Sequence, residues 1–332
     1  MSLDHVTTKP HDRLAKALAT EMAQVNDLIT LKMASEYAPR IPEVTAHLVD
    51  AGGKRLRPML TLAAARICSY DGPYHIHLAA TVEFIHTATL LHDDVVDESA
   101  QRRGRPTANL LWDNQSSVLV GDYLFSRSFQ LMVETGNLRV LDILANASAT
   151  IAEGEVLQLS TAQDLTTTEE TYFKVIRGKT AALFSAATEV GAVIAGQEAT
   201  TVQALHNYGD ALGISFQIVD DLLDYSGTDA TGKNLGDDFR ERKLTLPVIK
   251  AITVADEAEK VFWHRCITKG EQAGNDLDQA LEIMRRHGTL EITRLQAIDW
   301  SNRAKQALEP LPPSDIRDML TDLADYVVAR LS

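Results

Sequence analysis

The sequence has few cysteines, a deficit of basic residues and no long apolar run. Its 332 residues include two cysteines, Cys68 and Cys266, too few for a disulfide framework or a structural zinc site. This favours a reducing, cytoplasmic setting. The 46 acidic residues against 32 basic ones give a net charge of −14, which disfavours nucleic-acid binding. The longest apolar stretch, 181–196, is interrupted by polar residues and is too short to span a membrane.

Proline is absent between Pro106 and Pro247, and this interval is rich in Ala, Leu and Glu. Such a composition predicts one helix after another. Leu205, Leu212 and Val219 belong to an apolar stripe with steps of three or four residues, which is typical of a long helix. We therefore predict an all-α protein with a single domain over 1–332. The residues up to about 15 are polar, and we expect a flexible N-terminus without a signal peptide.

Four segments with loop composition divide the helical pattern. They are rich in Gly, Pro or basic residues and span 51–58, 99–107, 225–243 and 310–314. The strand-like segments 117–124 and 190–195 lack hairpin turns beside them, so we predict that both are helical. Thr167 and Glu170 have the spacing of a capping box for the helix that follows.

The pattern D-D-x-x-D occurs twice, each time near the predicted end of a helix. It is formed by Asp93, Asp94 and Asp97 and again by residues 220–224. Positions i and i+4 share one face of a helix, so each motif presents at least two carboxylates together, and Gln217 lies one turn below Asp220. Mg²⁺ binds one or two protein carboxylates and completes its shell with water and substrate phosphate. The motifs therefore predict magnesium-dependent binding of a diphosphate.

The alternative is a pair of solvated acidic helix ends. Two arguments count against it. The helix macrodipole disfavours negative charge near a helix C-terminus. If the motifs also face each other, like charges about 4 Å apart cost about 4 kcal/mol per pair at an effective dielectric of 20. Such a cluster requires cations, which favours metal binding.

Basic residues in or beside the loops and short motifs complement these acids, in segments where Gly or Pro lets the backbone approach an anion. They are Lys54, Arg57, Arg102, Arg103, Lys179, Lys233 and Lys243. The sequence contains no complete P-loop, no G-x-G-x-x-G after a strand and no H-E-x-x-H. A kinase, a nicotinamide enzyme and a zinc hydrolase therefore lose support.

Together these motifs resemble those of the trans-isoprenyl (E-type) diphosphate synthases, close to their long-chain polyprenyl branch. The resemblance runs from about Gly52 to the C-terminus. The matching segments are Gly52 to Pro58, Glu83 to Asp97, Arg102 to Gly104, Pro106-Thr107, Gly178 to Thr180, Phe216 to Asp224, Gly232-Lys233 and Lys243 to Pro247. One departure is Arg242, where relatives often carry glycine, and it affects the expected lid geometry beside Lys243.

The resemblance implies an all-α isoprenoid-synthase bundle around a deep central cavity, usually as a homodimer in the cytoplasm. It implies a prenyltransferase. An allylic diphosphate ionises, isopentenyl diphosphate attacks the carbocation head to tail, and proton loss releases a longer trans product. About three Mg²⁺ ions per active site, which Mn²⁺ can replace, would stabilise the departing diphosphate. No membrane span is expected, only peripheral membrane contact during product release.

The resemblance also implies roles for individual residues. Metal ions would be bound by Asp93, Asp97 and Asp220, with support from Asp94, Asp221 and Asp224. The allylic diphosphate would be held by Arg102, Lys179 and Lys243, assisted by Lys233, and isopentenyl diphosphate by Lys54, Arg57, His86 and Arg103. The oxygen dipoles of Thr180 and Gln217 would face the developing cation.

Product length is predicted from the residues below Asp93 on its helix. Thr89, Ala88 and Ile85 lie one to two turns towards the N-terminus. Short-chain relatives carry bulky aromatics at positions 88 and 89, so Ala and Thr predict an open upper tunnel. The alternative is close helix packing at small residues. An open tunnel implies an octaprenyl to decaprenyl product, of the kind used in quinone side chains, from a farnesyl or geranylgeranyl primer.

Three other functions remain as alternatives. A shorter-chain geranylgeranyl or farnesyl synthase would differ only in the tunnel. A class I terpene cyclase shares the fold and the first motif, but normally replaces the second motif and needs no isopentenyl site. A non-catalytic subunit of a heteromeric prenyltransferase would usually have lost aspartates, and here both motifs are intact.

Overall fold

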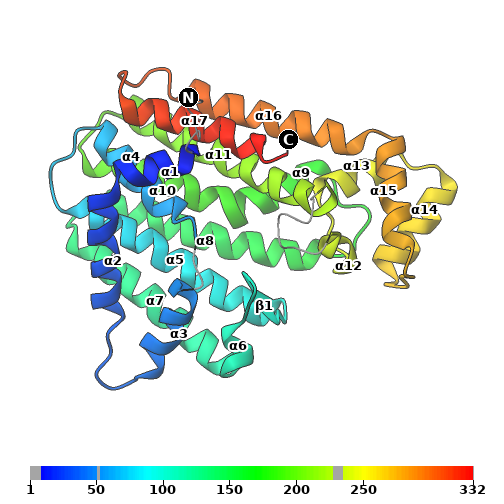
Figure 1. The fold of residues 1–332 in the computed structure, drawn as a ribbon, viewed down its shortest axis with the longest axis horizontal. Coiled ribbons are helices and arrows are strands. Elements are labelled where there is room, and N and C mark those ends of the chain that lie inside the picture. Colours follow the sequence, from blue (N-terminus) through cyan, green and yellow to red (C-terminus); the bar gives the residue numbers. More distant parts are fainter. Residues whose placement is uncertain (1–8, 51–52, 227–234, 332) are drawn as a thin grey trace, which may run out of the picture. The chain divides into compact units, whose positions relative to one another are not determined.

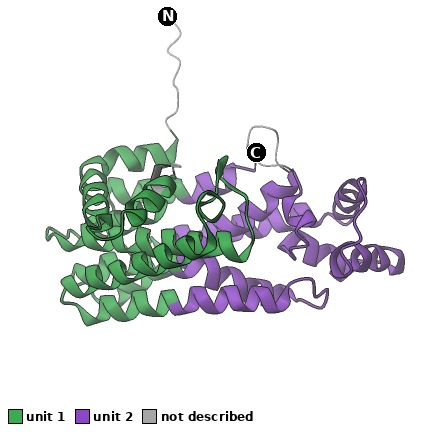
Figure 2. Ribbon diagram, turned by 90° about the horizontal axis from the view of Figure 1, so that it is seen from below, with its two compact units in different colours: residues 1–148, 183–206, 308–323 green, residues 149–182, 207–307, 324–332 purple. Residues whose placement is uncertain are grey.

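The computed structural model describes residues 9–50, 53–226 and 235–331. Its elements confirm the all-α prediction (Figure 1). The chain forms two compact units, shown in Figure 2. Each combines segments that are distant in sequence: unit 1 comprises 1–148, 183–206 and 308–323, and unit 2 comprises 149–182, 207–307 and 324–332. No single cut in the sequence separates them.

Unit 1 contains most of the N-terminal helices and a short hairpin. Its elements are α1 (Pro10–Ala17), α2 (Ala19–Met33), α3 (Arg40–Asp50), α4 (Leu56–Ile67), α5 (Tyr74–Val96), β1 (Gln101–Arg102), β2 (Arg105–Pro106), α6 (Ala108–Leu111), α7 (Asn114–Glu134) and most of α10 (Ala182–Ile194). The first parts of α8 (Leu138–Thr161), α11 (Ala199–Ser226) and α17 (Asp315–Ala329) also belong to it.

Helix α5 forms the centre of unit 1 and packs against α2, α4 and α7. Its apolar residues are buried over most of its length, as expected for a helix surrounded by others. Helix α10 approaches α4 closely at Gly191, where an added Cβ would lie 2.7 Å from the Cβ of Ala64. Small residues thus allow the tight packing that holds α4 and α5 in place.

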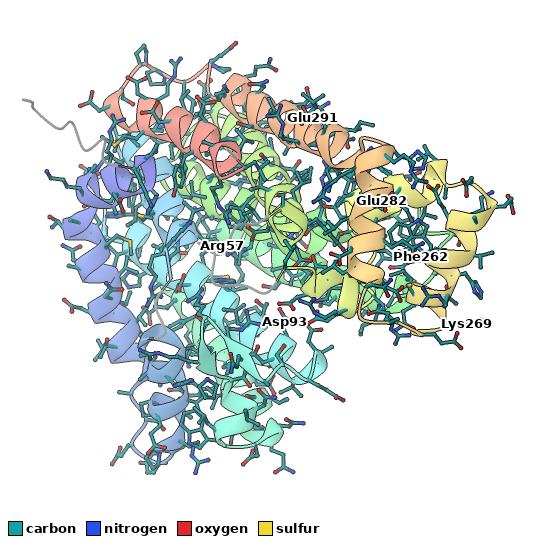
Figure 3. The ribbon with its side chains drawn as sticks, turned by 45° about the vertical axis from the view of Figure 1, so that its right-hand side comes forward. Arg57, Asp93, Phe262, Lys269, Glu282 and Glu291 are labelled. Atoms are coloured by element: carbon teal, nitrogen blue, oxygen red, sulfur yellow. The ribbon has the colours of Figure 1, made fainter. Side chains whose placement is uncertain are left out.

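Unit 2 contains the remaining parts of α8, α11 and α17. Its other elements are α9 (Glu169–Ile176), a π-helical turn (Arg177–Ala181), α12 (Asp237–Arg240), α13 (Leu246–Val254), α14 (Glu257–Trp263), a second π-helical turn (His264–Thr268), α15 (Asp276–Arg286) and α16 (Thr289–Ala307). Helix α13 packs against α9, α14, α15 and α16. A cluster around Trp263, Phe239 and Tyr225 forms a core in this unit. Figure 3 labels Phe262, Glu282 and Glu291 on α14, α15 and α16.

Both strand-like segments are helical, as predicted, in α7 and α10. The long helix predicted from its apolar stripe is α11, and 310–314 separates α16 from α17. Among the described residues, no helix has the length and apolar character needed to cross a membrane.

Three local predictions were wrong. Of the N-terminus expected to be flexible up to about residue 15, residues 1–8 lie outside the described residues. Residues 10–15 are not flexible but belong to α1, where Leu14 is completely buried. Residues 99–107 are not only loop but contain the β1–β2 hairpin, whose corner is formed by Arg103 and Gly104 at positive φ. The N-cap of α9 is Thr168 rather than Thr167, because the Thr168 side chain accepts the bond from the Thr171 amide.

Candidate active site

The first aspartate motif lies at the C-terminal end of α5 in unit 1, where Figure 3 labels Asp93. Asp93 is partly exposed, and Asp97 is the C-cap residue and is exposed. Asp94 is completely buried. The motif therefore directs its first and last carboxylates towards solvent and its middle carboxylate into the protein.

Asp94 orients Arg102, which the sequence assigned to the allylic diphosphate. The Nε and Nη2 atoms of Arg102 each lie 2.8 Å from Oδ1 of Asp94. Nδ2 of Asn109 donates to the Asp94 backbone carbonyl over 3.3 Å, which ties α6 to the end of α5. The buried acid thus holds the hairpin cation beside the exposed acids of the same motif.

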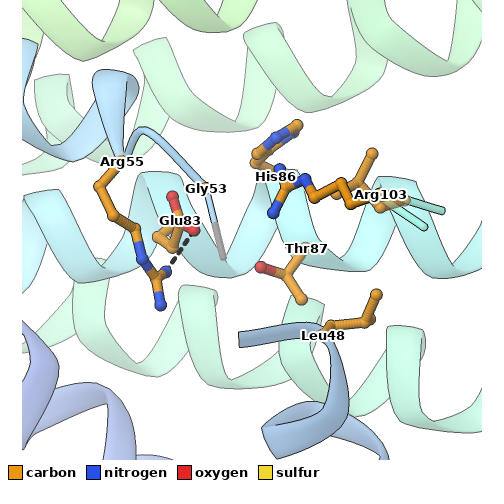
Figure 4. A pocket seen from close by; sticks show the side chains of 8 residues that line it. Leu48, Gly53, Arg55, Glu83, His86, Thr87 and Arg103 are labelled. Carbon is orange, nitrogen blue, oxygen red and sulfur yellow. Dashed lines mark hydrogen bonds and ion pairs between the residues drawn. The ribbon is translucent and has the colours of Figure 1, made fainter. Parts of the chain in front are cut away.

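A small pocket lies in unit 1 between α5 and the loop before α4 (Figure 4). Arg103 lines it, and an added Cβ on Gly53 would lie 2.8 Å from the Arg103 guanidinium. A side chain at this position would displace the Arg103 guanidinium, so glycine lets the arginine pack against the loop. Arg55, whose backbone is left-handed, forms an ion pair with Glu83 at the pocket wall. The full lining is Leu48, Gly53, Arg55, Glu83, His86, Thr87, Leu90 and Arg103.

His86 lies in this pocket and contacts Arg57. Nη1 of Arg57 is 3.2 Å from Nε2 of His86, and the Arg57 guanidinium lies 4.5 Å from the ring centroid of Phe184. Burial, followed by the charges of Arg57 and Arg103, holds the pKa of His86 well below its usual range. His86 is therefore neutral near pH 7, and its ring nitrogen can accept a hydrogen bond from the Arg57 guanidinium. Three of the four residues predicted for isopentenyl diphosphate thus lie together, whereas Lys54 is exposed outside the pocket lining.

The second motif lies near the end of α11 in unit 2. Asp220 is partly exposed, and its Oδ1 atom accepts a bond of 2.8 Å from Nη2 of Arg330. Asp224 is buried and caps α12, because its two carboxylate oxygens accept from the backbone amides of Asp237 and Asp238 over 3.1 and 3.0 Å.

Asp221 is buried, and both of its carboxylate oxygens are engaged. The Tyr172 hydroxyl donates to Oδ2 over 2.6 Å, and the Gln217 amide donates to Oδ1 over 2.8 Å. Burial raises the pKa of Asp221, whereas these two bonds oppose the shift. The Thr180 hydroxyl donates to the Gln217 carbonyl oxygen over 2.8 Å. The structure thus brings together the two predicted dipole residues, Thr180 and Gln217.

Lys179 lies on the π-helical turn after α9. Its ammonium group bonds Glu155 and Gln158 of α8, each over 3.0 Å. The turn approaches α8 at Gly178, where an added Cβ would lie 2.9 Å from the Cα atom of Gly154. This close approach positions the lysine and the following threonine.

The remaining predicted residues have varied surroundings. Lys243 pairs with Glu241 over 2.6 Å, and Lys233 lies outside the described residues, as do Gly52 and Gly232. Arg242 has φ 60°, the left-handed region that favours glycine, which gives a physical reason for glycine at this position in relatives. The chain-length residues lie on α5: Ile85 and Ala88 are completely buried and Thr89 is partly exposed.

Several contacting residues were not predicted from the sequence. Arg55 and Glu83 lie within matching motifs, which is the signal that could have drawn attention to them. Tyr172 and Arg330 lie 49 and 110 residues from their aspartate partners, so no local pattern indicates either contact.

An all-α fold with two D-D-x-x-D helix ends, and a pocket of arginines and histidine in the unit that carries the first, is typical of enzymes that handle isoprenoid diphosphates. The comparisons with known proteins agree. Octaprenyl diphosphate synthase from Escherichia coli is 42% identical over 320 residues, which cover 96% of this chain and 98% of the relative.

Two solved structures are similar over nearly the full length. A decaprenyl diphosphate synthase from Rhodobacter capsulatus is 72% identical, with a TM-score of 0.95 over 97% of this chain and 99% of the other. A polyprenyl synthase from Caulobacter crescentus, complexed with calcium and isoprenyl diphosphate, is 50% identical, with a TM-score of 0.92 over 97% of this chain and 98% of the other.

The chain belongs to the polyprenyl synthetase family, whose model matches residues 38–284. The predictions of a prenyltransferase and of a long-chain trans-polyprenyl diphosphate synthase are thereby confirmed.

Proposed function

We propose that this protein condenses isopentenyl diphosphate head to tail onto an allylic diphosphate, farnesyl or geranylgeranyl, and releases a long trans product. One observation carries the proposal. The pocket around His86 gathers arginines from the loop before α4 and from the hairpin against α5, the helix that ends at Asp93 and Asp97. A diphosphate site and a carboxylate pair thus lie on one rigid element, as positioning of two diphosphates requires.

Isopentenyl diphosphate is proposed to bind in the unit 1 pocket. Arg103 lines it and Arg57 lies against His86, so their guanidinium groups can bind phosphate oxygens bidentately. Because His86 is neutral, it adds no further charge and accepts a hydrogen bond that orients Arg57. Arg55 is already paired with Glu83, so its role is to shape the pocket wall.

The carboxylates fit a hard divalent cation. Asp93 and Asp97 lie one turn apart at the end of α5 and supply two hard oxygen ligands. This suits Mg²⁺, which takes few protein ligands and the rest from water and phosphate. We propose that Asp93, Asp97 and Asp220 hold such ions, with Asp94, Asp221 and Asp224 as supports. When bound, Mg²⁺ stabilises charge on the departing diphosphate.

The allylic end is proposed to use the cations and dipoles of the hairpin and of unit 2. Arg102 and Lys179 are held by acidic neighbours. They are proposed to bind the allylic diphosphate together with Lys243, assisted by Lys233. The oxygens of Thr180 and Gln217 are proposed to stabilise the carbocation, which requires surroundings that exclude water.

We place the product at the decaprenyl end of the predicted octaprenyl to decaprenyl range. The solved decaprenyl synthase is 72% identical to this chain, whereas the octaprenyl synthase is 42% identical. A product of this length serves as a quinone side chain, and its release would involve peripheral membrane contact.

We also propose a homodimer. The apolar side chains of Leu119, Phe129 and Val133 lie on one side of α7 and are 66%, 44% and 66% exposed. Exposed apolar side chains grouped on one helix are typical of an interaction surface. Light scattering of the purified chain should give twice the mass of the monomer.

The function is tested with the purified chain, isopentenyl diphosphate, farnesyl diphosphate and Mg²⁺. Mass analysis should show a linear long-chain diphosphate. Cyclic hydrocarbons would indicate a terpene cyclase, a geranylgeranyl product would indicate a short-chain synthase, and no product without a second protein would indicate a non-catalytic subunit.

A further inference from the structure

Four polar side chains form a continuous chain of hydrogen bonds in unit 2. It runs from Tyr172 on α9 through Asp221 and Gln217 on α11 to Thr180 on the π-helical turn, over 2.6, 2.8 and 2.8 Å. Tyr172, Asp221 and Thr180 are 4%, 5% and 6% exposed. Only Tyr172 has no role in the proposed function, although it lies at one end of the chain.

The direction of each bond follows from the groups involved. The two carboxylate oxygens of Asp221 are acceptors, one for the Tyr172 hydroxyl and the other for the Gln217 amide nitrogen. The Gln217 amide is thereby oriented, and its carbonyl oxygen faces Thr180, whose hydroxyl donates to it. The tyrosine thus restricts how the carboxylate, and through it the amide, can turn.

Tyr172 is itself held firmly. The Thr168 side chain caps its helix, and the Tyr172 ring packs edge-on against Phe173 with centroids 5.5 Å apart. Glu169, the first residue of α9, bonds Lys250 on α13 over 2.8 Å. Helix α9 is therefore anchored. The Tyr172 hydroxyl is held in a fixed position and does not move with Asp221.

We propose that Tyr172 is a positioning residue that orients Gln217 through Asp221, so that the dipoles of Gln217 and Thr180 are aligned for the carbocation. This inference rests on the proposed function, because it assigns Tyr172 a part in the same reaction. A tyrosine that only satisfied a buried acid would instead affect stability without a specific effect on the chemical step.

The test combines Tyr172→Phe with a double-mutant cycle. Tyr172→Phe removes only the hydroxyl, and we expect kcat to fall about 10- to 100-fold, the scale of a small misplacement at a reacting centre. KM for both diphosphates should stay within about threefold, because no phosphate contact changes. In a Gln217→Leu background the same substitution should lower kcat less than about threefold, since its target is absent.

Tyr123→Phe is the matched control. The Tyr123 hydroxyl, in unit 1, contacts the carbonyl of Ala34 and the guanidinium of Arg127, so its loss tests a tyrosine hydroxyl remote from this chain of bonds. We expect its kcat to be unchanged. Thermal unfolding of all variants separates stability from catalysis.

Three results would overturn the proposal: an unchanged kcat in Tyr172→Phe, an equal loss of kcat in both backgrounds, or no effect of Gln217→Leu alone. The first two results leave the proposed function intact, whereas the third would also remove Gln217 from it. The prenyltransferase function itself fails only if the wild-type chain makes no product. If Tyr172→Phe does not fold, Asp221→Asn tests the same bonds, because an amide offers one acceptor oxygen where the carboxylate offers two, one to Tyr172 and one to Gln217. The same loss of kcat is expected, and a normal kcat would reject the proposal.

Discussion

Adjacent aspartates of the D-D-x-x-D motifs have different surroundings, although they are the same residue type. Consecutive residues of a helix point in directions about 100° apart. Asp93 and Asp220 are therefore partly exposed, whereas Asp94 and Asp221 turn into the protein and bond Arg102 and Tyr172. The exposed acids are suited to ligate metal, and the buried acids orient other side chains.

Asp93→Ala is expected to lower kcat about 100-fold or more, because it removes a carboxylate from the metal site. Its thermal stability should change little, since Asp93 is only partly buried. Steady-state turnover and thermal unfolding provide the measurements. Asp278→Ala, an exposed acid on α15, is the control and should keep full activity. Near-normal turnover of Asp93→Ala would reject the assigned role.

Asp276 is expected to contribute to the acid stability of unit 2. Its two carboxylate oxygens bond Arg265, each over 2.7 Å, and this arginine holds the pKa of Asp276 below its usual range. A lowered folded pKa contributes stability above the unfolded value of about 4 and loses it as pH falls. Urea midpoints should therefore fall from pH 5 to pH 3 in the wild type and fall less in Asp276→Asn. Parallel pH profiles for the two proteins would contradict this.

The residues proposed to bind ligand are easier to predict from the sequence than the residues proposed to position them. Asp93, His86 and Arg103 lie in short motifs whose spacing carries chemical meaning. Tyr172 and Arg330 lie in no motif. Only their short distances to Asp221 and Asp220, which lie on another helix, identify them as positioning residues. Lys54 also lies in a matching motif, and its side chain is exposed outside the pocket lining, so its role stays a prediction.

At the scale of elements, apolar periodicity and proline placement predict the helices. They do not predict where each helix ends or which helices come into close contact. The cap of α9 shifted by one residue, because Thr167 and Thr168 carry the same hydroxyl and only the backbone decides between them. The β1–β2 hairpin has too few residues to show an alternating pattern. The π-helical turn at Lys179 has no sequence signature beyond its Gly178.

Gly178→Ala is expected to displace this turn. The new Cβ would lie 2.9 Å from both the Cα atom of Gly154 and the carbonyl oxygen of Thr150. Both are backbone atoms, so relieving the contact requires a shift of the main chain, which costs free energy. We expect a loss of about 1–3 kcal/mol in the free energy of unfolding, together with reduced kcat as Lys179 and Thr180 shift. Gly274→Ala is the matched control, since nothing lies within 4 Å of its added Cβ. Equal stability of the two variants would contradict the packing argument.

Ala88→Phe tests whether α5 borders the growing chain. Ala88 is completely buried, so a phenyl ring either fills an open tunnel or overpacks the helix contact. The tunnel predicts shorter products with retained turnover and a similar melting temperature, measured by product mass and thermal unfolding. Overpacking predicts a loss of about 1–3 kcal/mol without a change in product length, and would refute the tunnel. Ala88→Ser should keep the product length.

At the scale of the whole molecule, both units combine distant segments, and the first aspartate motif belongs to unit 1 and the second to unit 2. The sequence predicted the helical class and both motifs because these depend on local patterns. It did not predict this division, because α8, α11 and α17 each run through a unit boundary without a change in composition.

Arg330 is bonded to one of the aspartates that we propose as metal ligands. Arg330, just after α17, bonds Asp220 over 2.8 Å, and its guanidinium lies 5.3 Å from the ring centroid of Phe216. A positive charge beside a carboxylate opposes the binding of a divalent cation. Arg330→Gln should therefore increase the affinity of the substrate-free enzyme for Mn²⁺ about three- to tenfold, measured by electron paramagnetic resonance. Arg303→Gln, which breaks an ion pair with Asp299 on α16, should leave the affinity unchanged. A weaker affinity in Arg330→Gln would instead mean that the arginine orients Asp220 for the metal, because a competing cation can only lower metal binding.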